Sequence, residues 1–401
     1  MAAANKPDYP GRLLQATAIA KPFQESIEAE VRKRKEANLS VPKLVGILAK
    51  PNPPSIAYAE WTRKACTAVG INFEIWKTWD DADEASNVEQ AADQEKSDSL
   101  QNFGLEADVE DLILAANRDE SVDGVMIYYP IFGGRQDTYL QQIVDPRKDV
   151  EGLNFYYCWN LYHNVRWIKP SHLGNAPGTT SESELLNDPK VAEKGQAPEG
   201  YAKSILPCTP LAVVKALESV GVYDLKLPYG NRLYGKTVTV INRSEVVGRP
   251  LAALLANDGA RVFSVDIDSI VEFDKRAEQG SPRNTGLAKS ERVRKAHEEN
   301  TKASLRSSHV VRASKHSDVE SCVRESDVVV GGVPSASYKV PTSWIKEGAV
   351  CINFSSEKNF ESDVRSRASA YLPIIGKITV AMLQRNLLRL VEYKGIAQGQ
   401  K

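Results

Sequence analysis

The chain has 401 residues, of which 42% are hydrophobic and 26% charged, and its formal net charge is −1. These values are typical of a soluble globular protein, and the length predicts two domains. The balanced charge excludes a general attraction to nucleic acid or to a membrane surface. No apolar run is long enough to span a bilayer, and the N-terminus lacks a secretory signal core, although a weak similarity to a transit peptide leaves organelle import as an alternative.

The cysteines and histidines predict neither a disulfide framework nor a metal site. The five cysteines are scattered and include no CxxC pair, and the five histidines show no ligand spacing. An odd number of isolated cysteines is typical of reduced thiols in the cytosol. We therefore expect a cytoplasmic protein without a bound metal.

The first half of the chain alternates helical and strand patterns. Ser55 is the predicted N-cap of one helix. Strands that alternate with helices indicate a parallel sheet with helices on both faces. The acidic stretch 80–98 is expected to be a loop or the edge of a helix. The predicted helices are 23–37, 55–69 and 109–117, and the predicted strands are 43–49, 72–77 and 124–129.

The most informative segment begins with the short apolar β-branched run 238–241. A turn at Asn242-Arg243-Ser244 follows, then a helical pattern over 247–257 and a second strand, 261–265, which ends at Asp266. The acid lies roughly 20 residues beyond the turn, as in units that hold a pyrophosphate at a helix N-terminus and a ribose near an acid. The segment predicts a nicotinamide cofactor, with NAD favoured; the alternative is an ordinary βαβ unit without a ligand.

The rest of the second half continues the same alternation. A helix over 210–221 is expected to begin with Thr209 as its cap and Pro210 in its first turn. Two segments rich in charge and poor in large apolar residues, 171–202 and 272–318, are predicted to be surface insertions. The later predicted elements are the strands 327–331 and 349–354 and a final helix over 379–393.

Seven short motifs, in this order and at these separations, resemble the methylenetetrahydrofolate dehydrogenase/cyclohydrolase family. The resemblance covers most of the chain apart from the two predicted insertions, and it is strongest to the monofunctional NAD-dependent branch of that family. The motifs are 55–58, 123–130, 148–153, 206–210, 243–248, 344–349 and 379–383.

The resemblance implies an α/β fold of two domains around a cleft. Residues 1–205 would form a folate-binding catalytic domain, completed by a C-terminal helix over 376–401. Residues 206–375 would form an NAD-binding Rossmann domain with a doubly wound parallel sheet. A tetrahydrofolate substrate and a homodimer are implied in the same way.

Three departures from the family pattern decide the expected chemistry. Thr62 stands where the bifunctional members have a catalytic lysine, Tyr128 replaces a glutamine and Glu151 replaces an aspartate. Hydride transfer needs positioning rather than proton removal, whereas hydrolysis of the methenyl product needs proton transfer. We therefore expect oxidation without cyclohydrolase activity. The alternatives are a bifunctional enzyme that uses another group and a non-catalytic NAD-binding regulatory protein.

On the folate side, the resemblance assigns a role to four residues. Tyr58 would line the folate pocket, Tyr128 would lie beside it at a strand end, and Glu151 would accept hydrogen bonds from the pterin. Thr62 would occupy the place of the lost amine.

On the cofactor side, three groups of residues are expected to contact the dinucleotide. One holds the pyrophosphate, one repels a 2′-phosphate at the ribose and so favours NAD, and one approaches the nicotinamide end. Arg243 and Arg249 could instead attract a 2′-phosphate. The pyrophosphate group is Arg243, Ser244, Val247 and Gly248. The ribose group is Asp266 and Asp268. The nicotinamide group is Gly331, Gly332, Val333, Pro334 and Thr379.

Overall fold

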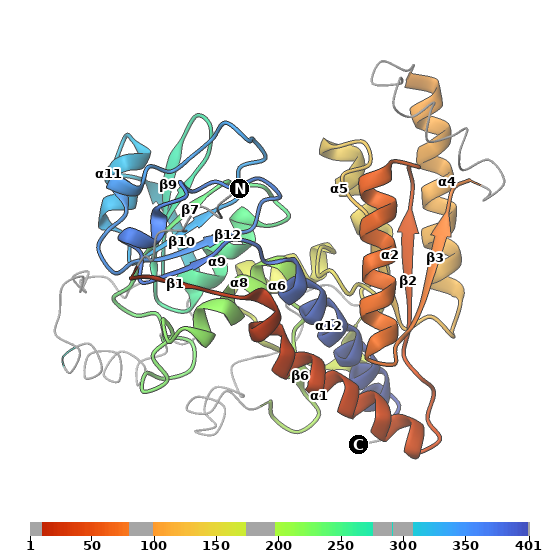
Figure 1. The fold of residues 1–401 in the computed structure, drawn as a ribbon. Coiled ribbons are helices and arrows are strands. Elements are labelled where there is room, and N and C mark those ends of the chain that lie inside the picture. The colour runs from red at the N-terminus through yellow and green to blue at the C-terminus, as the bar shows by residue number, and fades with distance from the viewer. Residues whose placement is uncertain (1–9, 80–98, 174–196, 276–290, 292–307, 400–401) are drawn as a thin grey trace, which may run out of the picture.

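The computed structural model describes residues 10–79, 99–173, 197–275, 291 and 308–399. The predicted loop 80–98 lies outside the described residues. Figure 1 shows two α/β lobes that are joined below by a layer of helices. The predicted α/β fold class, with a Rossmann-type sheet in the C-terminal lobe, is confirmed.

The smaller lobe is built on a three-stranded parallel sheet of order β3-β2-β4. Side chains of β2 alternate between two cores: Leu44 and Leu48 pack toward α2, while Val45 and Ile47 pack toward α4 and α5. Burial on both faces explains why these strands read as continuous apolar runs. The elements of this lobe are β2 (Lys43–Leu48), α2 (Pro53–Ala68), β3 (Asn72–Lys77), α4 (Ser99–Arg118), β4 (Gly124–Ile127) and α5 (Gly134–Ile143).

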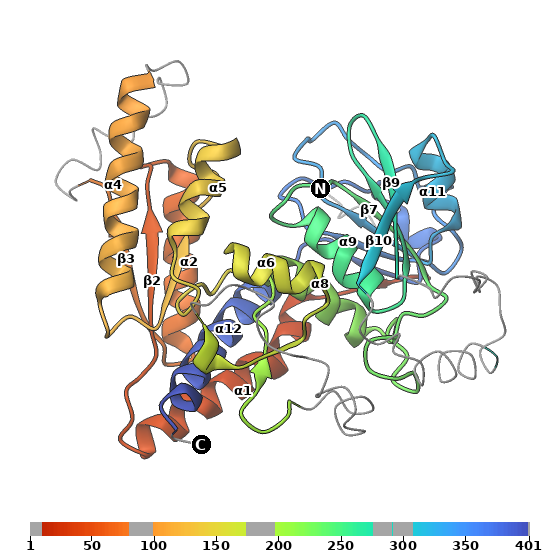
Figure 2. The ribbon, with the colours of Figure 1, turned by 180° about the vertical axis from the view of Figure 1, so that it is seen from behind.

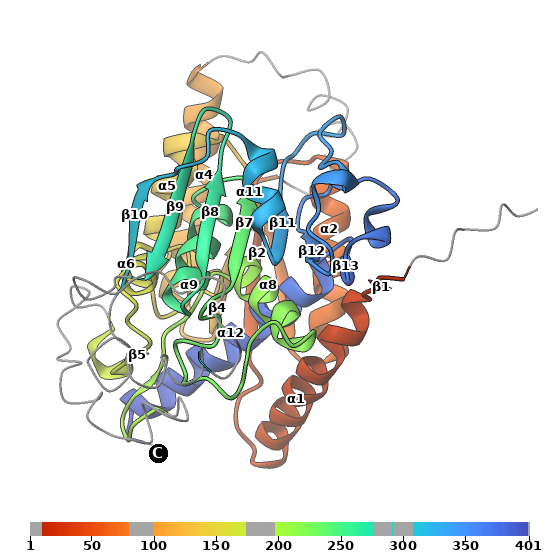
Figure 3. The ribbon, with the colours of Figure 1, turned by 90° about the vertical axis from the view of Figure 1, so that its left-hand side faces the viewer.

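The larger lobe is built on an eight-stranded sheet of order β1-β13-β12-β11-β7-β8-β9-β10 (Figure 3). The strands from β1 to β8 in this order are parallel, and β9 and β10 are antiparallel additions. Its strands are β1 (Arg12–Leu13), β7 (Thr237–Ile241), β8 (Arg261–Val265), β9 (Ile270–Lys275), β10 (His309–Ala313), β11 (Val328–Gly331), β12 (Val350–Asn353) and β13 (Ala370–Leu372).

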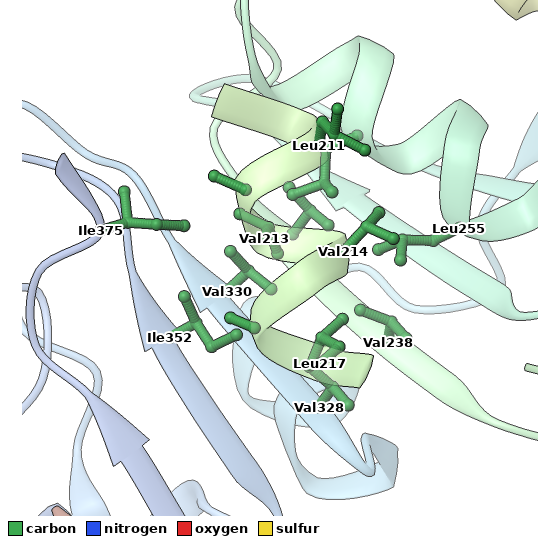
Figure 4. Close-up of a cluster of buried hydrophobic side chains, with 14 of the residues drawn as sticks. Leu211, Val213, Val214, Leu217, Val238, Leu255, Val328, Val330, Ile352 and Ile375 are labelled. Atoms are coloured by element: carbon green, nitrogen blue, oxygen red, sulfur yellow. The ribbon is translucent and has the colours of Figure 1, made fainter. Parts of the chain in front are cut away.

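Helices cover both faces of this sheet, as a doubly wound fold requires. On one face, Val328 and Val330 pack with α8 (Cys208–Ser219) and α9 (Gly248–Asn257), and Figure 4 shows α8 lying in this cluster. On the other face, Val329 packs with α11 (Val319–Glu325). Two short 3-10 helices, η5 (Thr342–Trp344) and η6 (Val364–Ser366), contribute to that second face.

The last helix, α12 (Gly376–Ala397), links the two lobes. Its first turns bury Ile378 and Met382 in the core of the larger lobe, and its later turns bury Leu387 and Tyr393 in the core of the smaller lobe. Two further helices and two short strands lie in this layer, and Figure 2 shows the helices from behind. They are α1 (Ala16–Glu36), α6 (Phe155–Tyr162) and a small antiparallel pair, β5 (Trp167–Ile168) and β6 (Ala202–Lys203).

Two predicted helix caps are wrong. The Oδ1 of Asn52, not Ser55, caps α2 by accepting from the Ser55 backbone N–H at 2.9 Å. The two prolines that follow Asn52 suit the first helical positions, so the helix begins earlier than predicted. In α8 the cap position is Pro207, without a side-chain hydrogen bond, and Thr209 lies inside the helix.

The prediction that 272–318 is wholly a surface insertion is also wrong. Its ends form β9 and β10 of the large sheet, while 276–290 and 292–307 lie outside the described residues. The charged sequence did not indicate a strand, because a charged residue suggests an exposed position. Glu272 is nevertheless buried, in an ion pair with Arg261 at 2.6 Å. The other predicted insertion, 171–202, ends in β6 and begins within the 3-10 helix η2 (Pro170–His172), and its residues 174–196 are outside the described part.

Candidate active site

Two tyrosines define the folate side of the candidate site. The rings of Tyr58 on α2 and Tyr128 after β4 meet edge to face, with centroids 5.8 Å apart, and Tyr58 also stacks on Trp61. Tyr58 is 40% exposed, whereas Tyr128 is 8% exposed. An exposed aromatic ring held by two others offers a flat surface for a heterocycle.

Tyr128 has room because of a glycine in the neighbouring strand. A Cβ on Gly46 of β2 would lie 3.2 Å from the Tyr128 ring and 2.8 Å from Phe73. The Tyr128 hydroxyl is buried without a well-formed hydrogen bond in the described structure. Burial raises the Tyr128 pKa, and the nearby Thr62 hydroxyl opposes that rise. Tyr128 therefore remains a neutral phenol.

Thr62 lies one turn after Tyr58 and is fully buried. Its Oγ1 donates to the Tyr58 carbonyl oxygen at 2.9 Å, so the hydroxyl proton is used inside the helix. The side chain carries no base with a pKa near neutrality.

Glu151 lies in a loop whose backbone is held by the side chain of Asp149. The Asp149 carboxylate accepts from the backbone N–H groups of Glu151 at 3.0 Å, Gly152 at 2.8 Å and Asn154 at 2.7 Å. Burial raises the pKa of Asp149 to about 6, although these donors oppose the rise. The loop is thus a fixed frame for the Glu151 side chain.

The Glu151 carboxyl group faces the strand end that carries Tyr128. Its Oε2 accepts from the Ile127 N–H at 2.9 Å, and within the described residues Oε1 accepts no hydrogen bond. Burial raises the pKa of Glu151 to about 8, with the Ile127 N–H opposing the rise and the Asp149 charge adding to it. Burial raises the pKa of Tyr58 as well, and the charge of Glu151 contributes. The two side chains therefore share one electrostatic environment.

The last helix fixes the loop that carries Glu151. Asn386 of α12 donates through Nδ2 to the carbonyl oxygens of Val150 at 2.8 Å and Leu206 at 2.9 Å. Gly152, with φ +70°, lets this loop approach the chain at Leu206, since a Cβ there would lie 2.8 Å from the Leu206 carbonyl carbon. Neither residue was among the predicted site residues.

The cofactor side begins with the turn after β7. Asn242 has φ 124°, a conformation that few side chains tolerate. Its Nδ2 donates to the Gly332 carbonyl at 2.8 Å, and its Oδ1 accepts from the Ser244 N–H at 2.7 Å. A Cβ on Gly248 would lie 1.8 Å from the Asn242 carbonyl oxygen, so only glycine fits there. Ser244 Oγ lies 3.3 Å from the N–H nitrogen of Val247, at the start of α9.

The second turn, after β11, lies against the first. A Cβ on Gly332 would lie 1.8 Å from the Phe354 ring, which fixes glycine at this position. The Val333 N–H donates to Asn359 Oδ1 at 2.7 Å, and the Asn359 amide donates back to the Val333 carbonyl at 2.9 Å. Pro334 follows as an exposed residue. The backbone of both turns is therefore held by asparagine side chains.

Arg243 does not point freely into solvent. Its guanidinium donates to the Ser264 Oγ at 3.1 Å and carbonyl at 2.6 Å, and to the Ser269 Oγ at 2.9 Å and carbonyl at 2.8 Å. It therefore clamps the turn after β8, where Asp266 and Asp268 are both exposed. The Arg243 donors are therefore used within the protein, and the role of the two carboxylates at the ribose stays a prediction.

Helix α6 connects the two sides. Arg249 of the cofactor unit lies 4.9 Å from the centroid of the Tyr162 ring on α6, and pairs with Glu245 at 2.9 Å. From the middle of the same helix, the Cys158 thiol lies 3.5 Å from the Leu153 carbonyl in the loop that carries Glu151. Thr379 lies in the first turn of α12 and is 9% exposed.

Comparisons with known proteins agree with this geometry. Residues 14–151 match the tetrahydrofolate dehydrogenase/cyclohydrolase catalytic domain, and residues 207–279 match the NAD(P)-binding domain of the same family. The methylenetetrahydrofolate dehydrogenase [NAD(+)] of Schizosaccharomyces pombe is 41% identical over 391 residues, which are 97% of this chain and 96% of that protein. The enzyme of the same name from Saccharomyces cerevisiae is 42% identical over 385 residues, which are 95% and 96% of the two chains.

The chain belongs to the tetrahydrofolate dehydrogenase/cyclohydrolase family. A solved structure of the NAD-dependent 5,10-methylenetetrahydrofolate dehydrogenase from S. cerevisiae, 40% identical, aligns with a TM-score of 0.71 and covers 98% of this chain and 100% of that chain. The resemblance drawn from the motifs is therefore confirmed. The individual roles of Tyr58, Tyr128, Thr62 and Glu151 stay predictions, although the structure brings the four together.

Several residues that hold the site in place could not be identified from sequence motifs. Gly46, Asn359 and Asn386 act on the site through backbone or packing contacts, so no pattern in their own neighbourhood indicates them.

The described residues contain no group of three or more His, Cys, Asp or Glu that could hold a metal ion. In the same residues, every helix is too short or too polar to cross a membrane.

Proposed function

We propose that this chain oxidises 5,10-methylenetetrahydrofolate to 5,10-methenyltetrahydrofolate with NAD and does not hydrolyse the product. The observation that carries the proposal is a single framework in which an aromatic and carboxylate site lies on one side of α6 and the cofactor turn lies on the other. The relatives named above as NAD-dependent methylenetetrahydrofolate dehydrogenases match along nearly the whole chain, which supports the same activity here.

The residues of the chain position the folate rather than exchange protons with it. Tyr58 would stack on the pterin, and Glu151 Oε1 would accept from its amino and ring N–H groups, which requires the ionised carboxylate. The hydride leaves the methylene carbon with its electron pair, and the two flanking nitrogens stabilise the cation that remains. Bound NAD supplies the acceptor for this hydride.

The turns that follow β7 and β11 fit a dinucleotide. Gly248 and Gly332 leave space that a Cβ would fill, as a close approach of phosphate to backbone requires. Ser244, Val247 and Gly248 would hold the pyrophosphate, while Val333, Pro334 and Thr379 would border the nicotinamide end. NAD is favoured over NADP because the exposed Asp266 and Asp268 would repel a 2′-phosphate, and the guanidinium of Arg243 is already hydrogen-bonded by the protein.

The lack of cyclohydrolase activity follows from the group at Thr62. Hydrolysis of the methenyl cation needs a proton acceptor near the attacked carbon, and such a group contributes about 10²–10⁴-fold. Thr62 is buried, and its proton is committed to the Tyr58 carbonyl. Tyr128 has a raised pKa and is no substitute base.

The test is a spectrophotometric assay of the purified chain with methylenetetrahydrofolate and either NAD or NADP, with reduced cofactor and methenyl product followed at separate wavelengths. We expect reduction of NAD with methenyl product that persists. Loss of methenyl faster than its spontaneous hydrolysis would overturn the monofunctional proposal. No reduction with either cofactor would favour an NAD-binding regulatory protein.

We also propose a cytoplasmic homodimer that associates through the cofactor lobe. The location is supported by five free cysteines, and the dimer by the family resemblance and by β10, whose outer edge pairs with no other strand of the described sheet. Sedimentation equilibrium tests the assembly: a monomer at micromolar concentration would contradict it. Fractionation of cells that express the tagged chain tests the location.

A further inference from the structure

A cavity of about 340 Å³ lies between the larger lobe and the layer of helices, near the end of β7 opposite the cofactor turn. Its wall includes Gly230 and Arg232, which precede β7, whereas Asn242 of the cofactor turn follows the strand. Five strand residues separate the two ends by about 16 Å. The cavity is therefore distinct from the cofactor turn, and none of Tyr58, Tyr128, Thr62 and Glu151 lines it.

The wall of this cavity carries an excess of positive charge. Two cations have carboxylate partners, Arg166 with Asp258 at 2.9 Å and Lys215 with Glu218 at 2.7 Å. Four more cations line the cavity and form no ion pair with any described residue. These four are Lys203, Arg232, Arg385 and Arg389.

The unpaired cations are held close together rather than dispersed in solvent. All four are partly buried, and the Arg232 Nε is fully buried without a hydrogen-bond partner in the described structure. Burial of a charge without a counterion is unfavourable, so a cluster of this kind indicates a missing anion. In a chain whose net charge is −1, such a cluster does not follow from overall composition.

Tyr229 lies among these cations. The side chains of Arg166, Lys203 and Arg232 lie 5.0, 5.0 and 5.5 Å from the centroid of its ring. Burial would raise the pKa of Tyr229, yet the charges of Arg166 and Lys203 outweigh burial and lower it. Three cations therefore surround one aromatic ring in this wall.

We propose that this cavity binds a small polyanion that carries at least two phosphate or carboxylate charges. Donors converge on it from α12, from β6 and from the loop before β7, which suits a compact group with several acceptor oxygens. The volume admits a metabolite of a few carbons and excludes a macromolecule. Because α12 and β6 meet α8 and α9 here, an occupant would bridge the larger lobe and the layer of helices.

The test is isothermal titration of the full chain with pyrophosphate or with citrate at low ionic strength and saturating NAD, so that the cofactor turn is already filled. We expect one site per chain, with affinity that falls as salt is added. The double variant Arg385→Gln/Arg389→Gln should weaken binding at least tenfold. The matched control, Arg32→Gln/Arg312→Gln, removes two exposed arginines away from the cavity and should leave affinity unchanged.

Each outcome has a defined meaning. Binding of pyrophosphate alone identifies a phosphate site, and binding of citrate alone a carboxylate site. No binding of either, or equal binding by the cavity variant and the wild type, overturns the proposal. Dehydrogenase activity and the circular dichroism spectrum show that the variant is folded; if it is not, Arg232→Gln provides the same test through the buried Nε.

Discussion

The carboxyl group of Glu151 gives the most demanding prediction, because one substitution alters binding and two pH dependences together. In Glu151→Gln, the amide oxygen can still accept from the Ile127 N–H, so the frame of the loop is preserved. What is lost is the negative charge offered to the pterin. Charge-assisted hydrogen bonds contribute about 1.5–3 kcal/mol, so kcat/KM should fall roughly 10- to 150-fold.

The pH dependence follows from the raised pKa of this group. With a pKa of about 8 in the free protein, the ionised form that binds the pterin is scarce at pH 6, and kcat/KM should rise tenfold per pH unit until about pH 8. Stability should change in the opposite sense. The folded protein retains the Glu151 proton to a higher pH than the unfolded chain does. The contribution of this group to the free energy of unfolding is therefore complete below the ordinary glutamate pKa and is lost as the pH rises through about 8.

The assay is a pH series of kcat/KM and of urea unfolding for the wild type and Glu151→Gln. Glu151→Asp is the conservative control and should retain a rise in kcat/KM with pH. A wild-type profile that is flat between pH 6 and 9, or a rise of the same size in Glu151→Gln, would refute the assignment of the titrating group.

Three further changes test the framework. Gly248→Ala should abolish measurable NAD binding in a calorimetric titration, because its Cβ would lie 1.8 Å from the Asn242 carbonyl oxygen; wild-type affinity would refute the tight-turn account. Asn386→Leu leaves two backbone carbonyls without their donor and should cost about 2–4 kcal/mol in urea unfolding, with a loss below 0.5 kcal/mol contradicting it. Arg261→Leu leaves Glu272 buried without this partner and should cost about 3 kcal/mol, whereas the double change with Glu272→Met should recover most of the loss.

Much of the fold was predictable because the central strands are buried on both faces. The strand 261–265 was predicted at its observed bounds, and the predicted strands 238–241, 327–331 and 349–354 lie within one residue of β7, β11 and β12. The cofactor turn was predicted despite its missing glycines, since asparagine tolerates a positive φ and Asn242 has φ 124°. These features depend on local sequence, so local reasoning was sufficient.

The features that were missed depend on distant partners. The strand β9 was hidden because Glu272 is satisfied by Arg261 on another strand. The helix α1 was predicted to start at 23, yet it begins at Ala16 and contains Pro22, which a local pattern treats as a break. Asn386 acts from 236 residues away on the loop that carries the candidate carboxylate. No local pattern contains such contacts.

The proposed activity is direct hydride transfer to NAD without hydrolysis of the product, in an enzyme with Thr62 at the place of the lysine of the bifunctional members. The most direct measurement is a single turnover with methylenetetrahydrofolate deuterated at the methylene carbon, with mass spectrometry of the reduced cofactor and of the folate product. We expect one deuterium transferred to each NADH from the doubly labelled carbon and a methenyl product that decays only at its spontaneous rate. Deuterium appearing in water, or a formyl product formed at a rate proportional to enzyme concentration, would contradict it.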